Sequence, residues 1–270
     1  FAIKLAKKVK GEIVNADSMQ VYKDLKILSA RPVKKNFQKI KHHLYGFQSS
    51  KKIFTTGDWL KLAKSKIIDI KKRGKTPILV GGTGLYFKAL TEGLVKIPLI
   101  PLKFRNKVRK LQKDIGQKKF YKRLLKIDPI SKNNINSTDV QRSIRAYEVK
   151  TFTNKSIIEW FKDTKSSFKK QCFYKILLNH PRETLIEKIN RRTEEMLDKG
   201  AILEVKKFLK LKIPKERSPS KAIGISEITE FNKNLINKHE LIEKISIKTR
   251  QYAKRQVTWA RGHMSSWKKI

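Results

Sequence analysis

The sequence has 270 residues, of which 39% are hydrophobic, and this content is sufficient for one large packed domain or for a core with an insertion. Its 65 Lys and Arg residues against 23 Asp and Glu give a net charge of +42. Such a charge indicates a polyanionic partner, of which nucleic acid is the leading candidate. The single cysteine excludes an internal disulfide, and no apolar run approaches the ~20 residues that span a bilayer, so we expect a cytoplasmic protein without membrane contact.

The first third of the chain alternates amphipathic helices with short apolar strands. Helices are predicted at residues 1–9, 58–73 and 85–92, and strands at 12–16, 41–47 and 77–80. Asp58 is the predicted N-cap of the second helix, and Gly74 its end. The alternation predicts an α/β fold in which helices flank a parallel sheet.

From about residue 98 this alternation is lost, and the sequence up to residue 170 is helical in period and strongly basic. Residues 173–181 then resemble a returning strand, and helices are predicted at 182–199, at 202–211 and in a closing pair. We therefore predict a core domain in two parts, residues 1–97 and 171–270, interrupted by an all-helical insertion at 98–170.

Two predicted strands end in polar or glycine-rich tips, Asp17-Ser18 and Gly81-Gly82-Thr83-Gly84. The carboxyl ends of parallel strands meet at one edge of a sheet, where ligands bind, so these tips form a candidate pocket. Glycines there would let backbone amides approach a ligand closely. The alternatives are that Asp17 begins a turn or caps a helix, and that the glycines form a plain strand-to-helix turn.

Six segments are found in a specific order: IVNADSMQVYKDLKI, LVGGTGLYFKAL, DVQRSIRAYEV, RTEEMLDKG, KAIGISEI and TRQYAKRQVTWARG. Over practically the whole chain they resemble the bacterial tRNA dimethylallyltransferases, also called the IPP transferase or tRNA isopentenyltransferase family. The resemblance implies a fold similar to P-loop NTPases, with a helical insertion that binds the tRNA anticodon stem-loop. It also implies transfer of a dimethylallyl group from dimethylallyl diphosphate, accompanied by Mg²⁺, to the N6 amine of the adenosine 3′ to the anticodon.

The same resemblance assigns roles to individual residues. It makes Asp17 the general base, places Thr83 beside the reaction channel, and lets Arg192 neutralise the diphosphate, unless Arg192 is an ordinary surface arginine. The residues implied to contact tRNA are Asp17, Ser18, Met19, Gln20, Thr83, Arg105, Gln141, Arg142, Ser143, Ile144 and Arg145.

Some features depart from the family or have no catalytic reading. The family's glycine-rich P-loop precedes the helix that residues 1–9 continue, so we expect a truncated sequence lacking part of the donor site. Ile225 stands where the family usually has an aromatic residue, which weakens a stacking role. We interpret Tyr252 and Trp259 as core residues, and His42 and His43 as structural.

Two rival functions remain open at this stage. A non-catalytic RNA-binding protein would explain the charge and the missing loop, and a transferase that acts on free adenine nucleotides would share the fold. The basic helical insertion favours tRNA over a small acceptor. Biased codon composition is another source of the charge, since Lys, Ile and Asn are abundant throughout. We expect a monomer, because no apolar stripe demands a partner.

Overall fold

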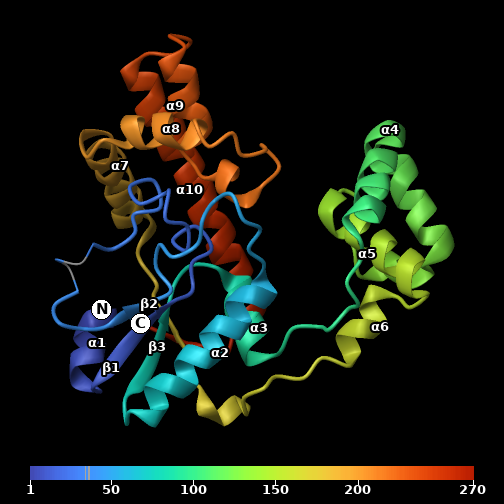
Figure 1. Ribbon diagram of the computed structural model, residues 1–270, viewed down its shortest axis with the longest axis horizontal. Helices are drawn as coiled ribbons and strands as arrows, with labels where there is room; N and C mark the ends of the chain where they lie inside the picture. The colour runs from blue at the N-terminus through green and yellow to red at the C-terminus, as the bar shows by residue number, and fades with distance from the viewer. Residues whose placement is uncertain (34, 36) are drawn as a thin grey trace. The chain divides into compact units, whose positions relative to one another are not determined.

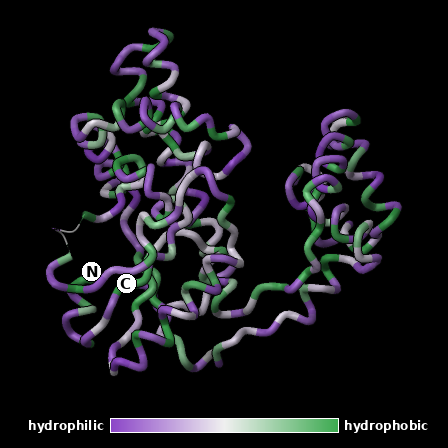
Figure 2. Tube along the Cα trace, in the orientation of Figure 1, coloured by the Kyte–Doolittle hydropathy of each residue, from purple (hydrophilic) through white to green (hydrophobic). Residues whose placement is uncertain are grey.

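The computed structural model describes residues 1–33, 35 and 37–270, with only the backbone of Lys170, and divides into two compact units (Figure 1). Unit 1 comprises Phe1–Ala89 and Gln171–Ile270, and unit 2 comprises Leu90–Lys170. Figure 2 shows hydrophilic and apolar positions alternating along the helices of each unit, as amphipathic helices require.

Unit 1 contains a parallel sheet of three strands (Figure 1). Its order is β2 (His42–His43), β1 (Gly11–Asn15) and β3 (Thr76–Val80). Every residue of β1 is buried, as is typical of a central parallel strand. Asn15 pairs with Val80, so β1 and β3 end side by side and the two predicted polar tips follow at the same edge. The predicted α/β fold with a parallel sheet is confirmed.

The helices of unit 1 are α1 (Ala2–Lys8), α2 (Thr56–Lys72), α3 (Gly84–Thr91, which continues into unit 2), α7 (Arg182–Asp198), α8 (Ala201–Leu209), α9 (Ile225–Asn232) and α10 (Lys238–His263). The prediction of Asp58 as the N-cap of α2 is wrong by three residues. Thr55 is the N-cap, and the Asp58 carboxylate accepts a hydrogen bond from its backbone amide at 2.8 Å. The reason is a capping box, in which the acid stands at the third helical position.

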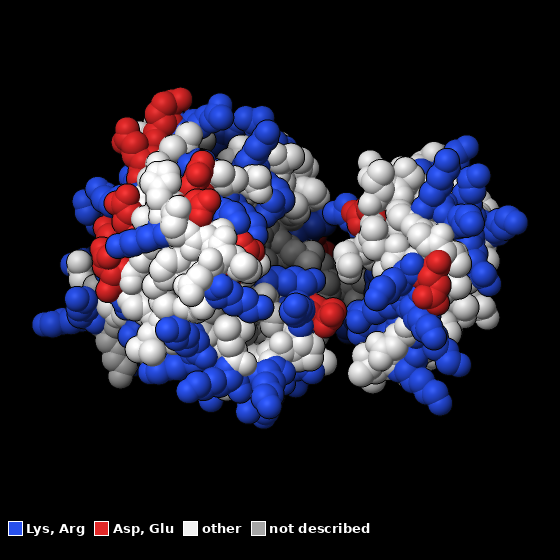
Figure 3. Space-filling model, turned by 90° about the horizontal axis from the view of Figure 1, so that it is seen from above, with Lys and Arg blue, Asp and Glu red and all other residues white. Residues whose placement is uncertain are grey.

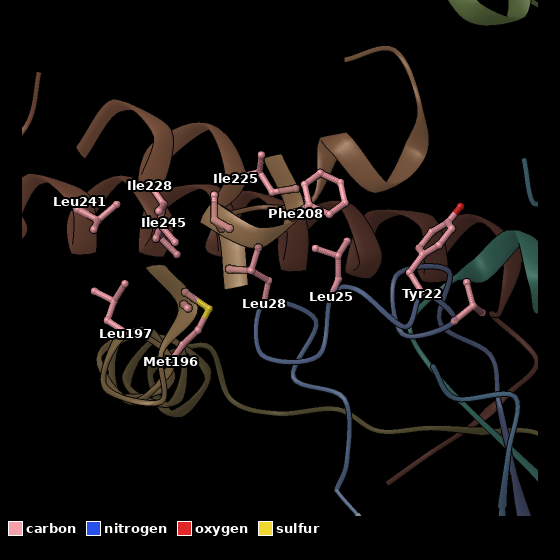
Figure 4. Close-up of a cluster of buried hydrophobic side chains, with 13 residues drawn as sticks. Tyr22, Leu25, Leu28, Met196, Leu197, Phe208, Ile225, Ile228, Leu241 and Ile245 are labelled. Atoms are coloured by element: carbon pink, nitrogen blue, oxygen red, sulfur yellow. The ribbon is translucent and has the colours of Figure 1, made fainter. Parts of the chain in front are cut away.

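The four C-terminal helices surround the main hydrophobic cluster of unit 1 (Figure 4). Leu25 and Leu28, from the segment after β1, insert between these helices. The Glu204 carboxylate of α8 also accepts hydrogen bonds from the amides of Lys26, Ile27 and Leu28 at 2.8 to 3.0 Å. Packing and polar contacts therefore fix residues 25–28, which lie a few residues after Asp17.

The strand predicted at residues 173–181 is much shorter than expected and does not return to the central sheet. β4 covers only Ile176–Leu177 and pairs in parallel with β5 (Lys268–Lys269). The apolar alternation identified an extended segment, but its partner is the C-terminal segment of the chain, which local sequence could not indicate.

Unit 2 is helical, with α4 (Leu102–Ile127), α5 (Val140–Thr153) and α6 (Ile157–Lys162). Helix α4 is interrupted at Gly116, where φ is 73°. Phe120 and Leu124 of α4 pack with Ala146 and Val149 of α5 in a separate core. A short 3₁₀ turn occupies Pro129–Asn133 in this unit. Two others are found at Lys170–Cys172, where the sequence passes from unit 2 to unit 1, and at Ser218–Lys221 in unit 1. None of the helices in the described part of the chain is long and apolar enough to cross a membrane.

One ion cluster holds a carboxylate inside the central strand. Glu12 of β1 is 1% exposed, and its oxygens lie 2.7 Å from His43 Nε2, 2.6 Å from Arg73 Nη2 and 3.2 Å from Lys75 Nζ. Burial alone raises the pKa of Glu12, but hydrogen bonds from His43, Lys75 and Arg73 outweigh burial and bring the pKa to about 2. The structural interpretation of His43 agrees with this contact.

We expect this cluster to make unit 1 sensitive to acid. The folded pKa of Glu12 is about 2 against 4.5 in the unfolded chain, so its contribution is complete above pH 4.5 and is lost as pH falls toward 2. Each unit of pKa difference is worth about 1.4 kcal/mol, which gives about 3 kcal/mol. Urea unfolding should show that Glu12→Gln loses stability at pH 6, with a much smaller loss at pH 2.5. Asp69→Asn, which removes an exposed partner of the same arginine, is the control and should cost far less.

Candidate active site

The structure brings the two polar strand tips together. The Ser18 amide donates to Thr83 Oγ1 at 2.9 Å, and the hydroxyls of these two residues are 3.2 Å apart. The Thr83 amide donates to the carbonyl oxygen of Ala16 at 3.2 Å. Thr83 therefore fastens the end of β3 to the end of β1, and its hydroxyl orients Ser18.

Glycines in this turn are required by close approach rather than by an unusual backbone angle. A Cβ on Gly81 would lie 2.1 Å from the carbonyl carbon of Ala16, and a Cβ on Gly84 would lie 2.2 Å from the Trp259 ring. Gln256 of α10 donates to the carbonyl of Gly82 at 3.0 Å. The space beside these glycines, which we predict for a ligand, is filled by Ala16, directly after β1, and by Gln256 and Trp259 of α10.

Asp17 is held by its neighbours so that its two oxygens differ. The buried Asn15 side chain accepts a hydrogen bond from the Asp17 amide at 2.9 Å and donates to the Asp17 carbonyl at 3.0 Å. Asp17 Oδ1 accepts hydrogen bonds from the amides of Met19 (2.8 Å) and Gln20 (3.2 Å). Among the described residues, Oδ2 has no hydrogen-bond partner. The interpretation that Asp17 begins a turn is therefore right for Oδ1. Oδ2 takes no part in the turn.

Three tyrosines lie close enough to Asp17 for its charge to affect them. Burial raises the pKa of Tyr45 to about 12, and it also raises those of Tyr86 and Tyr252, with the Asp17 carboxylate adding to each increase. Phenols with raised pKa values stay protonated at neutral pH and can donate hydrogen bonds. Sequence reasoning missed all three as site residues. Tyr45 follows β2, which ends at His43, whereas the predicted strand extends to residue 47. With the shorter strand, the rule that sites lie at strand ends would have identified Tyr45.

Arg192 of α7 is also near this carboxylate. Its Nη2 donates to the carbonyl of Leu28 at 3.4 Å, and the residue as a whole is exposed. Shielding of the guanidinium from water lowers the pKa of Arg192, while the Asp17 charge opposes that change. The charges of Arg192 and Asp17 are therefore close enough to interact.

Helix α10 lines the glycine turn with aromatic and basic side chains. The interpretation of Tyr252 and Trp259 as core residues is wrong, because Tyr252 is 36% exposed and Trp259 is only partly buried. Trp259 stacks on His263 with ring centres 4.3 Å apart and fills the space left by Gly84. An open hollow of about 530 Å³ is lined by Gln251, Lys254, Arg255, Thr258, Trp259 and His263. By contrast, Ile225, at the position where the family usually has an aromatic, is a core residue at 6% exposure.

The remaining predicted tRNA contacts lie in unit 2, Arg105 on α4 and Gln141 to Arg145 on α5. Ser143 is fully buried, and its hydroxyl donates to the carbonyl of Asp139 at 2.7 Å. Ile144 is 7% exposed and belongs to the core of this unit. These two side chains therefore serve packing, which leaves Gln141, Arg142, Arg145 and Arg105 as the candidates at the surface. Lys and Arg side chains cover much of the visible face of each unit (Figure 3).

Fold and site together define a class. The α/β unit presents a fixed carboxylate near a cation and near tyrosines that stay protonated, and the second unit, which is helical, is rich in surface Lys and Arg. These features define an α/β protein with a polar site at the carboxyl edge of its sheet and a basic surface that suits an anionic partner.

Comparison with known proteins identifies the family. The sequence matches the IPP transferase family over residues 20–263. It is 60% identical over 270 residues to a tRNA dimethylallyltransferase of Pelagibacter ubique, covering all of this chain and 86% of the relative. Identity to the Rhizobium etli tRNA dimethylallyltransferase is 40% over 272 residues, covering all of this chain and 92% of that one. The chain belongs to the IPP transferase family.

Solved structures agree with this assignment. A tRNA isopentenylpyrophosphate transferase from Staphylococcus epidermidis superposes with a TM-score of 0.67 at 29% identity, over all of this chain and 87% of that one. A eukaryotic dimethylallyltransferase described as acting on tRNA superposes with a TM-score of 0.79, also at 29% identity, over 96% of this chain and 65% of that one.

Proposed function

We propose that this protein is a tRNA dimethylallyltransferase that moves a dimethylallyl group from dimethylallyl diphosphate to the N6 amine of the adenosine 3′ to the anticodon. Family membership over the full chain supports the reaction class. The observation that carries the mechanism is the Asp17 carboxylate, with Oδ1 fixed by two amides and Oδ2 free of partners among the described residues.

In the proposed step, the N6 lone pair forms a bond to the allylic carbon as the carbon–oxygen bond to diphosphate breaks. The electron pair of that bond leaves with diphosphate, and Asp17 Oδ2 accepts a proton from N6. A positioned carboxylate is needed because the exocyclic amine is a poor nucleophile, its lone pair being delocalised into the adenine ring. General-base assistance of this kind contributes roughly 10²- to 10⁴-fold.

The negative charge that develops on the diphosphate in the transition state would be stabilised by a cation and by hydrogen-bond donors around the site. Arg192 supplies a permanent cation for the diphosphate, and Tyr45 and Tyr252 supply neutral hydroxyl donors. Thr83 acts mainly through Ser18, which it orients at 2.9 Å, and the Ser18-Met19-Gln20 turn would border the extracted adenine.

The helical segment predicted at residues 98–170 would bind the anticodon stem-loop, with Arg105, Gln141, Arg142 and Arg145 contacting its backbone. Phosphate contacts also supply the few kcal/mol needed to extract the target base from the loop. We propose that the protein does this as a monomer.

Mg²⁺ beside the diphosphate remains a proposal from family resemblance. No group of three or more His, Cys, Asp or Glu side chains among the described residues is arranged to hold a metal ion. Mg²⁺ beside a diphosphate is usually held by one or two protein oxygens together with the substrate phosphates and water.

Labelled dimethylallyl diphosphate tests the proposal. Full-length protein should transfer label to a tRNA with adenosine 3′ to the anticodon, and nuclease digestion should recover the label on N6-dimethylallyladenosine. The same tRNA with guanosine at that position is the matched control and should stay unlabelled. Labelling of free adenine nucleotides instead would support the nucleotide-specific rival, and tight tRNA binding with no transfer would support the non-catalytic one.

A further inference from the structure

Unit 2 contains a buried carboxylate that contacts two of the surface arginines. Glu148 of α5 is 1% exposed. Its Oε2 lies 3.5 Å from Arg105 Nε on α4 and 3.3 Å from Arg145 Nη1 on α5. The side chains of Arg105 and Arg145 are 37% and 39% exposed, so each guanidinium spans from the buried carboxylate to solvent.

This arrangement is costly for folding alone. A buried carboxylate loses its hydration, and well-packed apolar residues often stabilise a protein more than a buried ion pair does. Glu148 Oε1 has no hydrogen-bond partner among the described residues, so the carboxylate is incompletely compensated. The two arginines exceed the carboxylate by one positive charge, and each guanidinium has five N–H donors, most of which are not used by Glu148.

We propose that Glu148 is a positioning residue that holds Arg105 and Arg145 together as one phosphate-binding site for the RNA backbone. This inference rests on the proposed function and adds to it a residue with no expected RNA contact of its own. Arg145 is held at the carboxylate by a hydrogen bond and Arg105 by an ion pair at 3.5 Å. Two planar guanidiniums held at one carboxylate suit the oxygens of a phosphate better than two freely moving side chains. Pre-organisation of this kind lowers the entropic cost of binding.

The substitution Glu148→Gln distinguishes this proposal from simple electrostatic attraction, because the two predict opposite changes in RNA affinity. The substitution removes a negative charge, so attraction between a basic protein and RNA would by itself strengthen binding. Loss of the anchor should instead raise the KM for tRNA about five- to tenfold, the size expected for the net contribution of one ordinary hydrogen bond. The kcat at saturating tRNA and the KM for dimethylallyl diphosphate should not change. Asp114→Asn is the matched control, because it removes one charge from the exposed surface of α4.

Binding of an anticodon stem-loop RNA, measured by fluorescence anisotropy, tests the inference without requiring catalysis. Failure of transfer by the wild type would overturn the proposed function, whereas this binding assay would still decide the role of Glu148. Unchanged or tighter binding by Glu148→Gln, as expected for Asp114→Asn, would overturn the proposal. If Glu148→Gln does not fold, judged by circular dichroism, Glu148→Asp replaces it. That variant keeps the charge but is too short to reach both arginines, so wild-type affinity in it would equally overturn the proposal.

A coupled experiment checks that Glu148 acts through the arginines. In a variant that carries both Arg105→Ala and Arg145→Ala, adding Glu148→Gln should cause no further loss of RNA affinity. A further loss as large as that seen in the wild-type background would contradict the positioning role.

Discussion

Asp17→Asn is expected to lower the rate of dimethylallyl transfer roughly 10²- to 10⁴-fold, the range that general-base catalysis contributes. The amide oxygen can still accept hydrogen bonds from the amides of Met19 and Gln20, so the turn should survive. The NH₂ group replaces Oδ2 and cannot take the N6 proton. Single-turnover assays with saturating tRNA and dimethylallyl diphosphate measure the chemical step directly, and tRNA affinity should be unchanged.

Asp24→Asn is the matched control for that substitution. The Asp24 carboxylate also accepts a hydrogen bond from a backbone amide, that of Ser50 at 3.0 Å, and it lies in the same segment of the chain. The single-turnover rate of Asp24→Asn should be near that of the wild type. Equal losses of tRNA binding and transfer in Asp17→Asn would show that Asp17 serves only the turn, and the base assignment would then be wrong.

Local patterns were sufficient to predict the frame of the site. The segments before Asp17 and Gly81 are each short, contain apolar residues side by side and are followed by turn residues, which is typical of buried parallel strands. Once two such strands are recognised, the rule that ligands bind at their carboxyl ends places Asp17 and Thr83 at the same edge, where they are found.

Residues brought in by tertiary packing could not be found in this way. Tyr252 comes from α10, more than 200 residues after Asp17, and no local period distinguishes a tyrosine that faces a site from one that faces the core. Glu148 is a similar case, since the helical period of its segment does not indicate the contact with Arg105 on another helix. The pairing of β4 with β5 has the same cause, because strand partners are chosen by the fold as a whole.

Gly81→Ala is expected to have the largest effect on stability among changes in the glycine turn. The added methyl group would lie 2.1 Å from the carbonyl carbon and 2.2 Å from the carbonyl oxygen of Ala16. Backbone atoms cannot rotate away as a flexible side chain can, so the ends of β1 and β3 must separate. Overpacking of this kind costs about 1–3 kcal/mol. Urea unfolding monitored by circular dichroism should show this loss.

The same separation should impair catalysis beyond the loss of stability. The Thr83 hydroxyl contacts Ser18 at 2.9 Å, so movement of β3 displaces the turn that carries Asp17. A displacement on the order of 1 Å can cost ~10²-fold in rate, and we expect the folded fraction of Gly81→Ala to lose at least about tenfold in kcat. Gly262→Ala in α10 is the matched control, since its Cβ meets nothing within 4 Å and alanine favours a helix by about 1 kcal/mol. Wild-type stability and rate in Gly81→Ala would show that the strand tips tolerate separation, and that the close approach of β3 to β1 does not position the catalytic carboxylate.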